Sequence, residues 1–436
     1  MSMVRVLDYA SIDEATLAQL LDRKEWNDPA VLDACRKIID AVRDEGDAAL
    51  VELTRRYDGA DLTPDRLRVS TEEAARAAGG VDDELRRSLT FALANIRRFH
   101  ETQVRQSLEL IEVANGIWCG ERSTPIDSVC LYVPRGRGAF SSVACMLGVP
   151  AVLAGVPEIV LCTPPGPGGR IDAATLFVAT ELGIEHVYRV GGAQAIAAVA
   201  FGTESIPRCD KVLGPGNVYV SGARQLLAAN IDGGPPAGPS ESLIVADGSV
   251  DPRNVAWNLL IEAEHGENSC ALLVTHERPL AQAVATAAEE LTQRLSPQRR
   301  QFVETVLGTR GGILLTTDID QSIDFANRFA AEHLALMVRD PWSVLPGVKH
   351  AGEILLGDYP IMSLANYAMG INAILPTGGG ARTYSGISVR DFCKTTSIGF
   401  VTSEGFDRLG KVVPPLSRDE GFSAHHEAIL DWRESS

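Results

Sequence analysis

Glu262 and His265 carry side chains that could bind a divalent metal ion together. Asp251 followed by Pro252 is typical of a helix start, and Gly266 of a helix stop, so we expect a helix between them. Residues three apart share one face of a helix, which brings this carboxylate and imidazole together. They would supply half of a metal site, for which zinc is the most suitable ion. The alternative is a solvated acid–base pair, the commoner role of this spacing.

Glu332 and His333 form a second acid–imidazole pair, this time adjacent in the chain. They follow a predicted helix that Asp320 can cap and precede the apolar strand Leu334–Val338. Both groups titrate within tuning range of neutral pH, so the pair is suited to proton transfer. A surface pair at a helix end is the equally simple alternative.

Three glycine-rich segments could approach a phosphate group. Apolar runs alternate with helical stretches between residues 129 and 213, which predicts a parallel sheet with helices on its faces. Such sheets bind ligands at the carboxyl ends of their strands, where Pro134–Gly138, Gly191–Gln194 and Gly214–Asn217 fall. Glycine lets the backbone come close, and helix N-termini offer free N–H groups. No segment completes GxGxxG, so simple tight turns are the alternative.

Length and composition limit the class of protein. A chain of 436 residues is expected to form two large domains, and its net charge of −17 argues against binding nucleic acid or an anionic membrane surface. The eight cysteines form no CxxC pair, so we expect reduced thiols. A polar N-terminus and the lack of an apolar run of about 18 residues predict neither a signal peptide nor a membrane span. We therefore expect a cytoplasmic protein.

The two ends of the chain position these groups. Residues 1 to about 110 are expected to be helical, with an apolar stripe along Val31–Glu45. The polar tail after Pro414-Pro415 is expected to pack weakly on its own chain, so a partner subunit could hold it.

The chain resembles the histidinol dehydrogenase family over nearly its whole length. Blocks that match the family pattern follow one another in the same order. They are Arg43–Gly59, Asn95–Gln103, Leu131–Pro134, Gly191–Ile196, Lys211–Val220, Ala237–Glu241, Ala263–Gly266, Glu332–Leu334, Leu375–Thr377 and Glu420–His425.

The resemblance implies a homodimer of α/β chains, each with two Rossmann-like parallel-sheet domains, a helical N-terminal region and a C-terminal tail exchanged between subunits. It implies an N-terminal extension (1–30), a catalytic and metal-binding domain (31–128 plus 241–385), an NAD-binding domain (129–240) and a C-terminal region (386–436). It also implies NAD as oxidant and one zinc ion per active site. In this family a primary alcohol is oxidised through an aldehyde to a carboxylate by two NAD.

The resemblance also assigns roles by position. Glu332 and His333 match the acid–base pair: His333 would take the alcohol proton, and Glu332 would activate the water that adds to the aldehyde. The positions that contact NAD are Tyr132, Gln194 and Asn217. The zinc ligands are Glu262, His265, Asn366 and His425 of the partner subunit. The substrate-side positions are Ser141, Ser240 and Glu420.

The expected metal shell departs from the family pattern at two positions. Glu262 stands where the family has glutamine, and Asn366 where it has aspartate. Together these changes keep one carboxylate, one amide and two imidazoles, all of them possible ligands. We therefore expect a zinc site whose carboxylate has moved to another ligand position.

Further departures concern the substrate. Ala373 replaces a histidine expected near the reacting end of the substrate, and a shortened loop carries Arg135 and Arg137 where the family has glycine and a small residue. Guanidinium groups suit the NAD pyrophosphate or an acidic substrate group, and solvated loop charges are the alternative.

Three hypotheses follow. The leading one is a zinc- and NAD-dependent dehydrogenase of this type, a divergent paralogue that takes a small-molecule primary alcohol to a carboxylic acid and whose substrate need not be histidinol. A hydroxymethyl compound with a sulfonate or carboxylate would fit the arginines. The second is a true histidinol dehydrogenase of L-histidine biosynthesis. The third is a non-catalytic metal-binding dimer, against which the presence of Glu332, His333, Glu420 and both histidine ligands argues.

Overall fold

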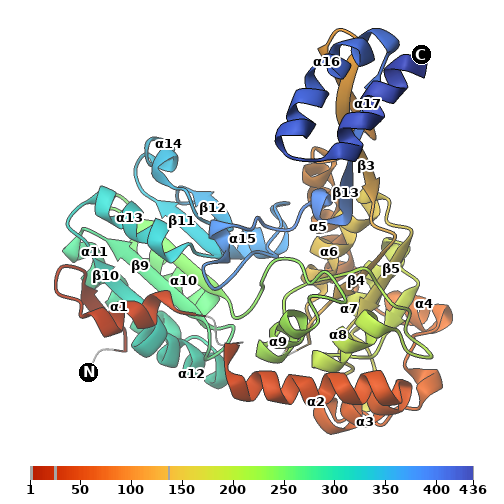
Figure 1. The fold of residues 1–436 in the computed structure, drawn as a ribbon. Coiled ribbons are helices and arrows are strands. Elements are labelled where there is room, and N and C mark those ends of the chain that lie inside the picture. Colours follow the sequence, from red (N-terminus) through yellow and green to blue (C-terminus); the bar gives the residue numbers. More distant parts are fainter. Residues whose placement is uncertain (1–2, 24–26, 136–137, 436) are drawn as a thin grey trace. The chain divides into compact units, whose positions relative to one another are not determined.

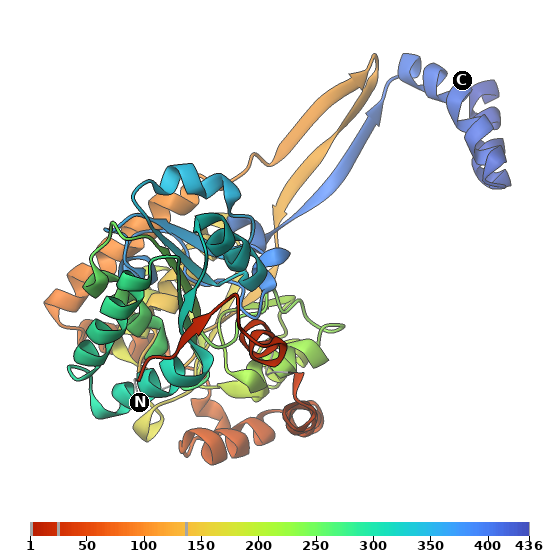
Figure 2. The ribbon, with the colours of Figure 1, turned by 90° about the vertical axis from the view of Figure 1, so that its left-hand side faces the viewer.

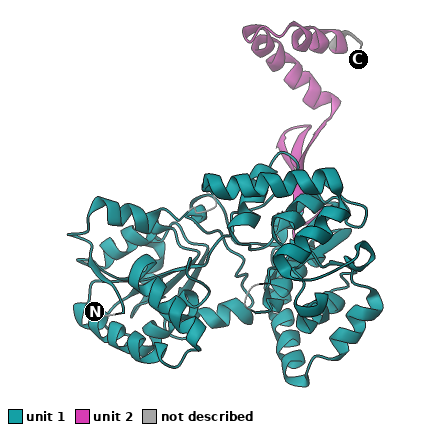
Figure 3. Cartoon of the chain, turned by 90° about the horizontal axis from the view of Figure 1, so that it is seen from below, with its two compact units in different colours: residues 1–103, 126–392 teal, residues 104–125, 393–436 magenta. Residues whose placement is uncertain are grey.

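The computed structural model of the protein describes residues 3–23, 27–135 and 138–435. Two compact units emerge (Figure 3): residues 1–103 with 126–392, and residues 104–125 with 393–436. Within the described ranges no helix is long and apolar enough to cross a membrane. Arg137, one of the two arginines singled out from the sequence, lies outside the described residues.

A four-stranded sheet in the first unit confirms the predicted strand–helix alternation. Its strands are all parallel, in the order β6-β5-β4-β7. They are β4 (Ser128–Tyr132), β5 (Glu158–Cys162), β6 (His186–Tyr188) and β7 (Lys211–Leu213). Four helices connect or follow them: α6 (Ser141–Ala154), α7 (Ala173–Glu181), α8 (Gly192–Phe201) and α9 (Val218–Leu226). The helices cover both faces, because alternate residues of β4 join the core with α6 and α7 and the core with α8 and α9.

The N-terminal helices pack on the helices that cover the four-stranded sheet (Figure 1). They are α2 (Pro29–Glu45), α3 (Asp47–Asp58), α4 (Thr71–Gly79) and α5 (Asp83–Glu101). The apolar stripe of α2 shares a core with α8 and α9, while α4 and α5 share one with α6 and α7. The expected domain boundaries, which group residues 31–128 with 241–385, stay a prediction. An apolar stripe shows that a helix is buried but not against which sheet.

A second, six-stranded parallel sheet has the order β1-β10-β9-β8-β11-β12. Its strands are β1 (Val6–Asp8), β8 (Glu241–Ala246), β9 (Cys270–Thr275), β10 (Gly312–Leu315), β11 (His333–Met337) and β12 (Glu353–Leu356). One core beside it includes α10 (Pro252–Ala263), α11 (Arg278–Thr292), α12 (Pro297–Thr305) and α15 (Met362–Tyr367). The other includes α1 (Glu14–Leu21) and α13 (Ile319–Phe329), with α14 (Pro341–Val344) bordering it.

Three local expectations need correction. Residues 1 to about 110 are not all helical, because β1 pairs with β10 and a further strand begins at Leu108. The helix before Glu332 begins after Asp318, not Asp320: the Asp318 side chain accepts a hydrogen bond from the Gln321 N–H. Finally, α10 ends at Ala263, so His265 lies just beyond the helix rather than on it.

The second unit is an antiparallel ribbon with a helical hairpin (Figure 2). The ribbon has the order β13-β3-β2, from β2 (Leu108–Ala114), β3 (Ile117–Pro125) and β13 (Cys393–Val401). The hairpin consists of α16 (Ser403–Asp419) and α17 (Ser423–Ser435), which pack on each other. The polar tail is thus an ordered helix within its own chain. Glu420 caps α16 and His425 lies in α17, and both side chains are exposed within this unit.

Candidate active site

Acidic and imidazole side chains gather at the amino ends of the strands of the six-stranded sheet. Glu241, His333 and Glu353 are the first residues of β8, β11 and β12, and His333 and Glu353 are register partners. Helix α10 follows β8 and ends at Ala263, shortly before the parallel strand β9 begins at Cys270, so its C-terminal end with Glu262 returns to the same edge. The fold therefore brings acidic, amide and imidazole groups together from distant parts of the sequence.

Three of the four predicted zinc ligands lie side by side. Glu262 is fully buried, and its Oε1 accepts a hydrogen bond of 2.8 Å from the Asn366 amide. Its Oε2 has no hydrogen-bond partner and lies 3.7 Å from Nε2 of His265. Nδ1 of His265 is 2.9 Å from the Ser240 hydroxyl, which orients the ring. The fourth predicted ligand, His425, belongs to the second unit.

These residues fit a divalent cation. A buried carboxylate oxygen without a partner is unfavourable, and a cation beside it would remove that cost. Burial works against ionisation of Glu262, but His265, His333 and the Asn366 amide together lower its pKa, so the anionic form is favoured. The described residues contain no cluster of three or more histidine, cysteine, aspartate or glutamate side chains suited to a metal. The proposed ligands in this unit are a carboxylate, an imidazole and the Asn366 amide, so they do not form such a cluster.

The predicted acid–base pair is buried beside this group. Nδ1 of His333 lies 2.5 Å from Oε1 of Glu353, and Nε2 lies 3.8 Å from Oε1 of Glu332. Oε2 of Glu332 accepts the backbone N–H of Glu241 at 2.8 Å. The surface-pair alternative is therefore excluded for these residues, because Glu332 is 7% and His333 3% exposed.

The surroundings shift both pKa values upward. Burial raises the pKa of Glu332 to about 8, against the opposing pull of His333. Burial disfavours the charged imidazole of His333, but Glu262, Glu332 and Glu353 outweigh it and raise the pKa of His333 to about 10. Of these carboxylates Glu262 raises the pKa of His333 most. A cation bound to Glu262 would therefore lower the pKa of His333 toward neutrality.

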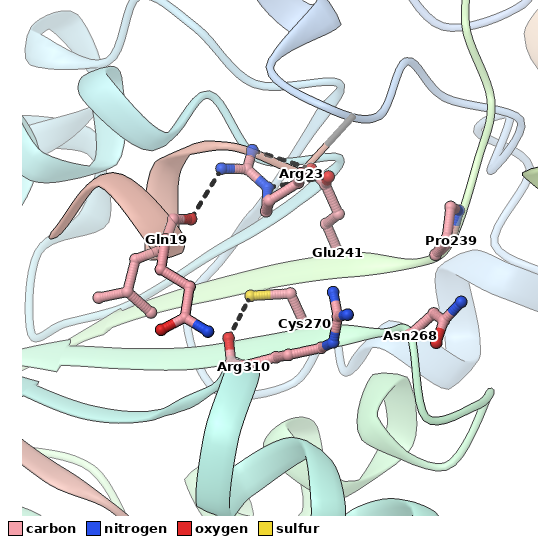
Figure 4. A pocket seen from close by; sticks show the side chains of 8 residues that line it. Gln19, Arg23, Pro239, Glu241, Asn268, Cys270 and Arg310 are labelled. Atoms are coloured by element: carbon pink, nitrogen blue, oxygen red, sulfur yellow. Dashed lines mark hydrogen bonds and ion pairs between the residues drawn. The ribbon is translucent and has the colours of Figure 1, made fainter. Parts of the chain in front are cut away.

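A buried ion pair supports the same edge (Figure 4). Arg23 pairs with Glu241 at 2.9 Å, donates to the Phe329 carbonyl at 2.8 Å and stacks on the Phe329 ring. Glu241 also accepts the Gly378 N–H at 2.7 Å. The pair thus ties the N-terminal segment to the backbone that fixes Glu332. A small pocket beside it is lined by Gln19, Leu20, Arg23, Pro239, Glu241, Asn268, Cys270 and Arg310.

The predicted NAD residues lie at the carboxyl ends of the four-stranded sheet. The Tyr132 hydroxyl accepts the Gly192 N–H at 3.0 Å, which joins the ends of β4 and β6. Gly192 has φ 64°, a left-handed conformation that favours glycine, and it leads into the buried Gln194. Asn217 follows β7 and caps α9, accepting from the N–H groups of Tyr219 and Val220 at 3.1 Å.

Arg135 lies in the loop after β4, and its side chain is exposed. Its guanidinium group packs against Gly166, in the loop after β5. A Cβ atom added to Gly166 would come within 2.3 Å of the guanidinium carbon, so the guanidinium fills the space of the missing side chain. Asp58, at the end of α3, feels the positive charge of Arg135. Burial nevertheless raises the pKa of Asp58 to about 6, and its Oδ2 has no hydrogen-bond partner. Asp58 gave no signal in the sequence beyond its acidity, since only packing places it here.

The remaining substrate-side positions are spread over both units. Ser141 begins α6 and Ser240 precedes β8, both half-buried, while Glu420 lies in the second unit. Ala373 is half-buried, and its N–H points at the Met146 sulfur at 3.2 Å. Glu353 was not among the residues expected from the sequence, although a carboxylate at the start of an apolar strand could have indicated it.

Comparisons with known proteins match nearly the whole chain to histidinol dehydrogenases. The Histidinol dehydrogenase family model matches residues 21–432. The chain is 44% identical to Histidinol dehydrogenase of Synechocystis sp. over 98% of this chain and 99% of that protein. It is 46% identical to Histidinol dehydrogenase homolog 2 of Mesorhizobium japonicum, over 100% of this chain and 99% of the relative.

A solved structure shows the same fold. The crystal structure of histidinol dehydrogenase from Elizabethkingia anophelis superposes with a TM-score of 0.93 at 33% identity, covering 100% of this chain and 99% of the other. The predicted α/β class with parallel sheets is therefore confirmed. The chain belongs to the histidinol dehydrogenase family, whose members are NAD-dependent oxidoreductases that act on an alcohol.

Proposed function

We propose that this protein is a zinc- and NAD-dependent dehydrogenase that oxidises a primary alcohol through an aldehyde to a carboxylate. The observation that carries the proposal is the orphaned Oε2 of Glu262, buried beside His265 and Asn366 and close to an acid–base pair. Glu262, His265, Asn366 and His425 of the partner subunit would hold the metal. That arrangement requires a homodimer with an exchanged C-terminal tail.

The residues of this chain divide the chemistry between them. When bound, NAD accepts a hydride in each oxidation, and zinc orients the substrate oxygen. Nε2 of His333 takes the hydroxyl proton of the alcohol, which makes hydride loss from the carbon feasible. Glu332 then takes a proton from the water that adds to the aldehyde. Tyr132, Gln194 and Asn217 form the proposed NAD contacts at the other sheet.

The substrate is proposed to be an alcohol other than histidinol. Position 373 offers a methyl group where a polar contact is expected, and losing such a contact costs about 1–3 kcal/mol of recognition. Arg135 follows β4 and lies beside Gly166 and Asp58, at the edge that carries the proposed NAD contacts, which favours the cofactor over the substrate as its partner. The proposed acidic substrate group therefore has less support than the change of substrate itself.

Histidinol remains the second candidate, because a relative 44% identical to this chain bears the name histidinol dehydrogenase. The test is NADH formation by zinc-loaded protein with saturating L-histidinol, with product counted per NADH. Negligible turnover, in protein that holds zinc and binds NAD, would support a different alcohol, and a panel of anionic primary alcohols would follow. Two NADH per histidine would establish the second candidate instead.

The metal assignment has a reciprocal test. Glu262→Gln leaves no carboxylate in the proposed shell, so we expect zinc to be lost on dialysis. Glu262→Gln combined with Asn366→Asp restores one carboxylate, at position 366 of the proposed shell, and should recover zinc. Zinc per chain is measured by mass spectrometry of the dialysed protein. A double variant as empty as the single one would refute the shell.

The exchanged tail is tested by complementation. An inactive His425→Ala chain and an inactive Glu332→Gln chain each lack one component of a shared site. If the tail is exchanged, mixed dimers contain one complete site and regain activity. No recovery after verified subunit exchange would mean that each site is built within one chain.

A further inference from the structure

Glu353 is a buried carboxylate that the roles given above leave unused. It begins β12, directly beside the first residue of β11, so its side chain and that of His333 project from neighbouring positions of a parallel pair. The Glu353 side chain is 5% exposed, and its Oε1 lies 2.5 Å from Nδ1 of His333. Of the two ion pairs that the His333 ring makes with described residues, this one is the shorter.

Packing alone does not account for a carboxylate at this position. Among the described residues, the ion pairs of Glu353 involve only His333, and its Oε2 has no hydrogen-bond partner. Burying a carboxylate costs free energy unless a positive group or a donor compensates. An apolar side chain would suit the neighbouring core better, since Leu355 on the same strand is buried there. The compensation for Glu353 therefore comes from the imidazole.

The two ring nitrogens of His333 face different groups. Nδ1 faces Glu353, whereas Nε2 is directed to the side of Glu332, at 3.8 Å from its Oε1. A ring whose Nδ1–H is held by a carboxylate keeps one orientation and leaves Nε2 to exchange protons. The same carboxylate balances the positive charge that forms when Nε2 gains a proton.

We propose that Glu353 is a positioning residue of the dehydrogenase, which accepts the Nδ1–H of His333 and so presents Nε2 to the substrate hydroxyl. The inference rests on the proposed function. In the oxidation, the alcohol O–H bond breaks and its proton goes to Nε2. The C–H bond of the carbon that bears this oxygen also breaks, its hydride would go to NAD, and the C=O bond forms. The Nδ1–H bond to Glu353 persists throughout. The imidazolium and the Glu353 carboxylate then form a buried pair until the proton is released.

The kinetic test uses Glu353→Gln, which keeps the volume but removes the charge. We expect kcat to fall by about 10²-fold or more, because the ring loses both its orientation and its compensating charge. The KM for the alcohol, the Kd for NAD and zinc per chain should change less than about threefold, since none of the proposed contacts with substrate, cofactor or metal is removed. Glu290→Gln, on the surface of α11, is the matched control and should keep the wild-type kcat. An unchanged kcat in Glu353→Gln would overturn the inference.

A second measurement does not depend on turnover. Proton NMR of the wild-type protein should show a far-downfield Nδ1–H resonance, identified by its loss in His333→Gln. The resonance should also disappear in Glu353→Gln, and its absence from the wild-type protein would contradict the proposed contact. If instead the resonance behaves as expected while wild-type protein oxidises no alcohol, the contact stands and the proposed function fails. Kinetics and spectroscopy thus separate the two.

Discussion

The two parallel sheets of the first unit place their candidate functional groups at opposite ends of their strands. In the four-stranded sheet, Tyr132 and the segments after β6 and β7 lie at the carboxyl ends, as expected for ligand sites in such sheets. In the six-stranded sheet, Glu241, His333 and Glu353 lie at the amino ends. Similar α/β layers therefore offer two chemically different edges.

Helix polarity gives a physical reason for this difference. Helices α6, α8 and α9 begin at the carboxyl edge of the four-stranded sheet, where their free N–H groups and partial positive charge suit the phosphates of NAD. At the amino edge of the six-stranded sheet, α10 ends instead. Its free carbonyl groups and partial negative charge suit a cation and a protonated imidazole.

The two edges also differ in the charge of their candidate functional groups. The amino edge of the six-stranded sheet holds a buried network of Arg23, Glu241, Glu262, His333 and Glu353. The proposed NAD contacts at the other edge are a phenol and two amides. Substitutions at the amino edge should therefore have the larger effects.

The largest expected effect is on catalysis at the amino edge. His333→Gln removes the proposed proton acceptor, so kcat should fall by about 10³-fold. NAD affinity, measured by fluorescence titration, should stay unchanged because the proposed cofactor contacts lie on the other sheet. Equal losses of kcat and NAD affinity would show that the two edges do not act separately.

An effect of comparable size is expected on stability. Arg23→Met leaves Glu241 buried without its counter-ion, which should lower the free energy of unfolding by about 3–5 kcal/mol in urea titrations. Arg253→Met breaks the exposed pair with Glu290 and should cost less than about 1 kcal/mol. If both variants lost the same stability, the buried pair would have no special role at this edge.

The next prediction concerns Asp58, a carboxyl group with a raised pKa near the carboxyl edge of the four-stranded sheet. Its pKa is raised to about 6, so the folded protein holds a proton that the unfolded chain releases, and stability falls as pH rises from about 4 to about 6. Asp58→Asn removes this loss. The variant should match the wild type near pH 4 and exceed it by about 1–2 kcal/mol at pH 7, allowing for partial solvent screening. Thermal unfolding without NAD at both pH values measures the difference, and a constant offset would refute the assignment.

The smallest effect is expected at Asn217, which both caps α9 and is a proposed NAD contact. Asn217→Ala should cost about 1 kcal/mol of stability, whereas Asn217→Gly should cost only a few tenths. Both variants remove the amide, so both should weaken NAD binding alike. If the Kd for NAD rises only in the alanine variant, the cap and not the contact supports the cofactor.

Local sequence signals determined much of the fold. The strand–helix alternation predicted the four-stranded sheet, and Asp251 and Pro252 predicted the start of α10, where the Asp251 side chain accepts the Arg253 N–H. These succeed because periodicity and capping depend on neighbours in the chain. The predicted proximity of Glu262 and His265 is found in the structure even though the helix ends before His265.

Only the tertiary structure decided which distant groups meet. Asn366 reaches Glu262 across 104 residues and Arg23 reaches Glu241 across 218, while Glu353 becomes the partner of His333 through strand register. Strand order, and hence the edge at which α10 returns, also lies beyond any local pattern. Sequence periodicity reports which residues are buried, whereas their partners depend on how whole sheets and helices pack.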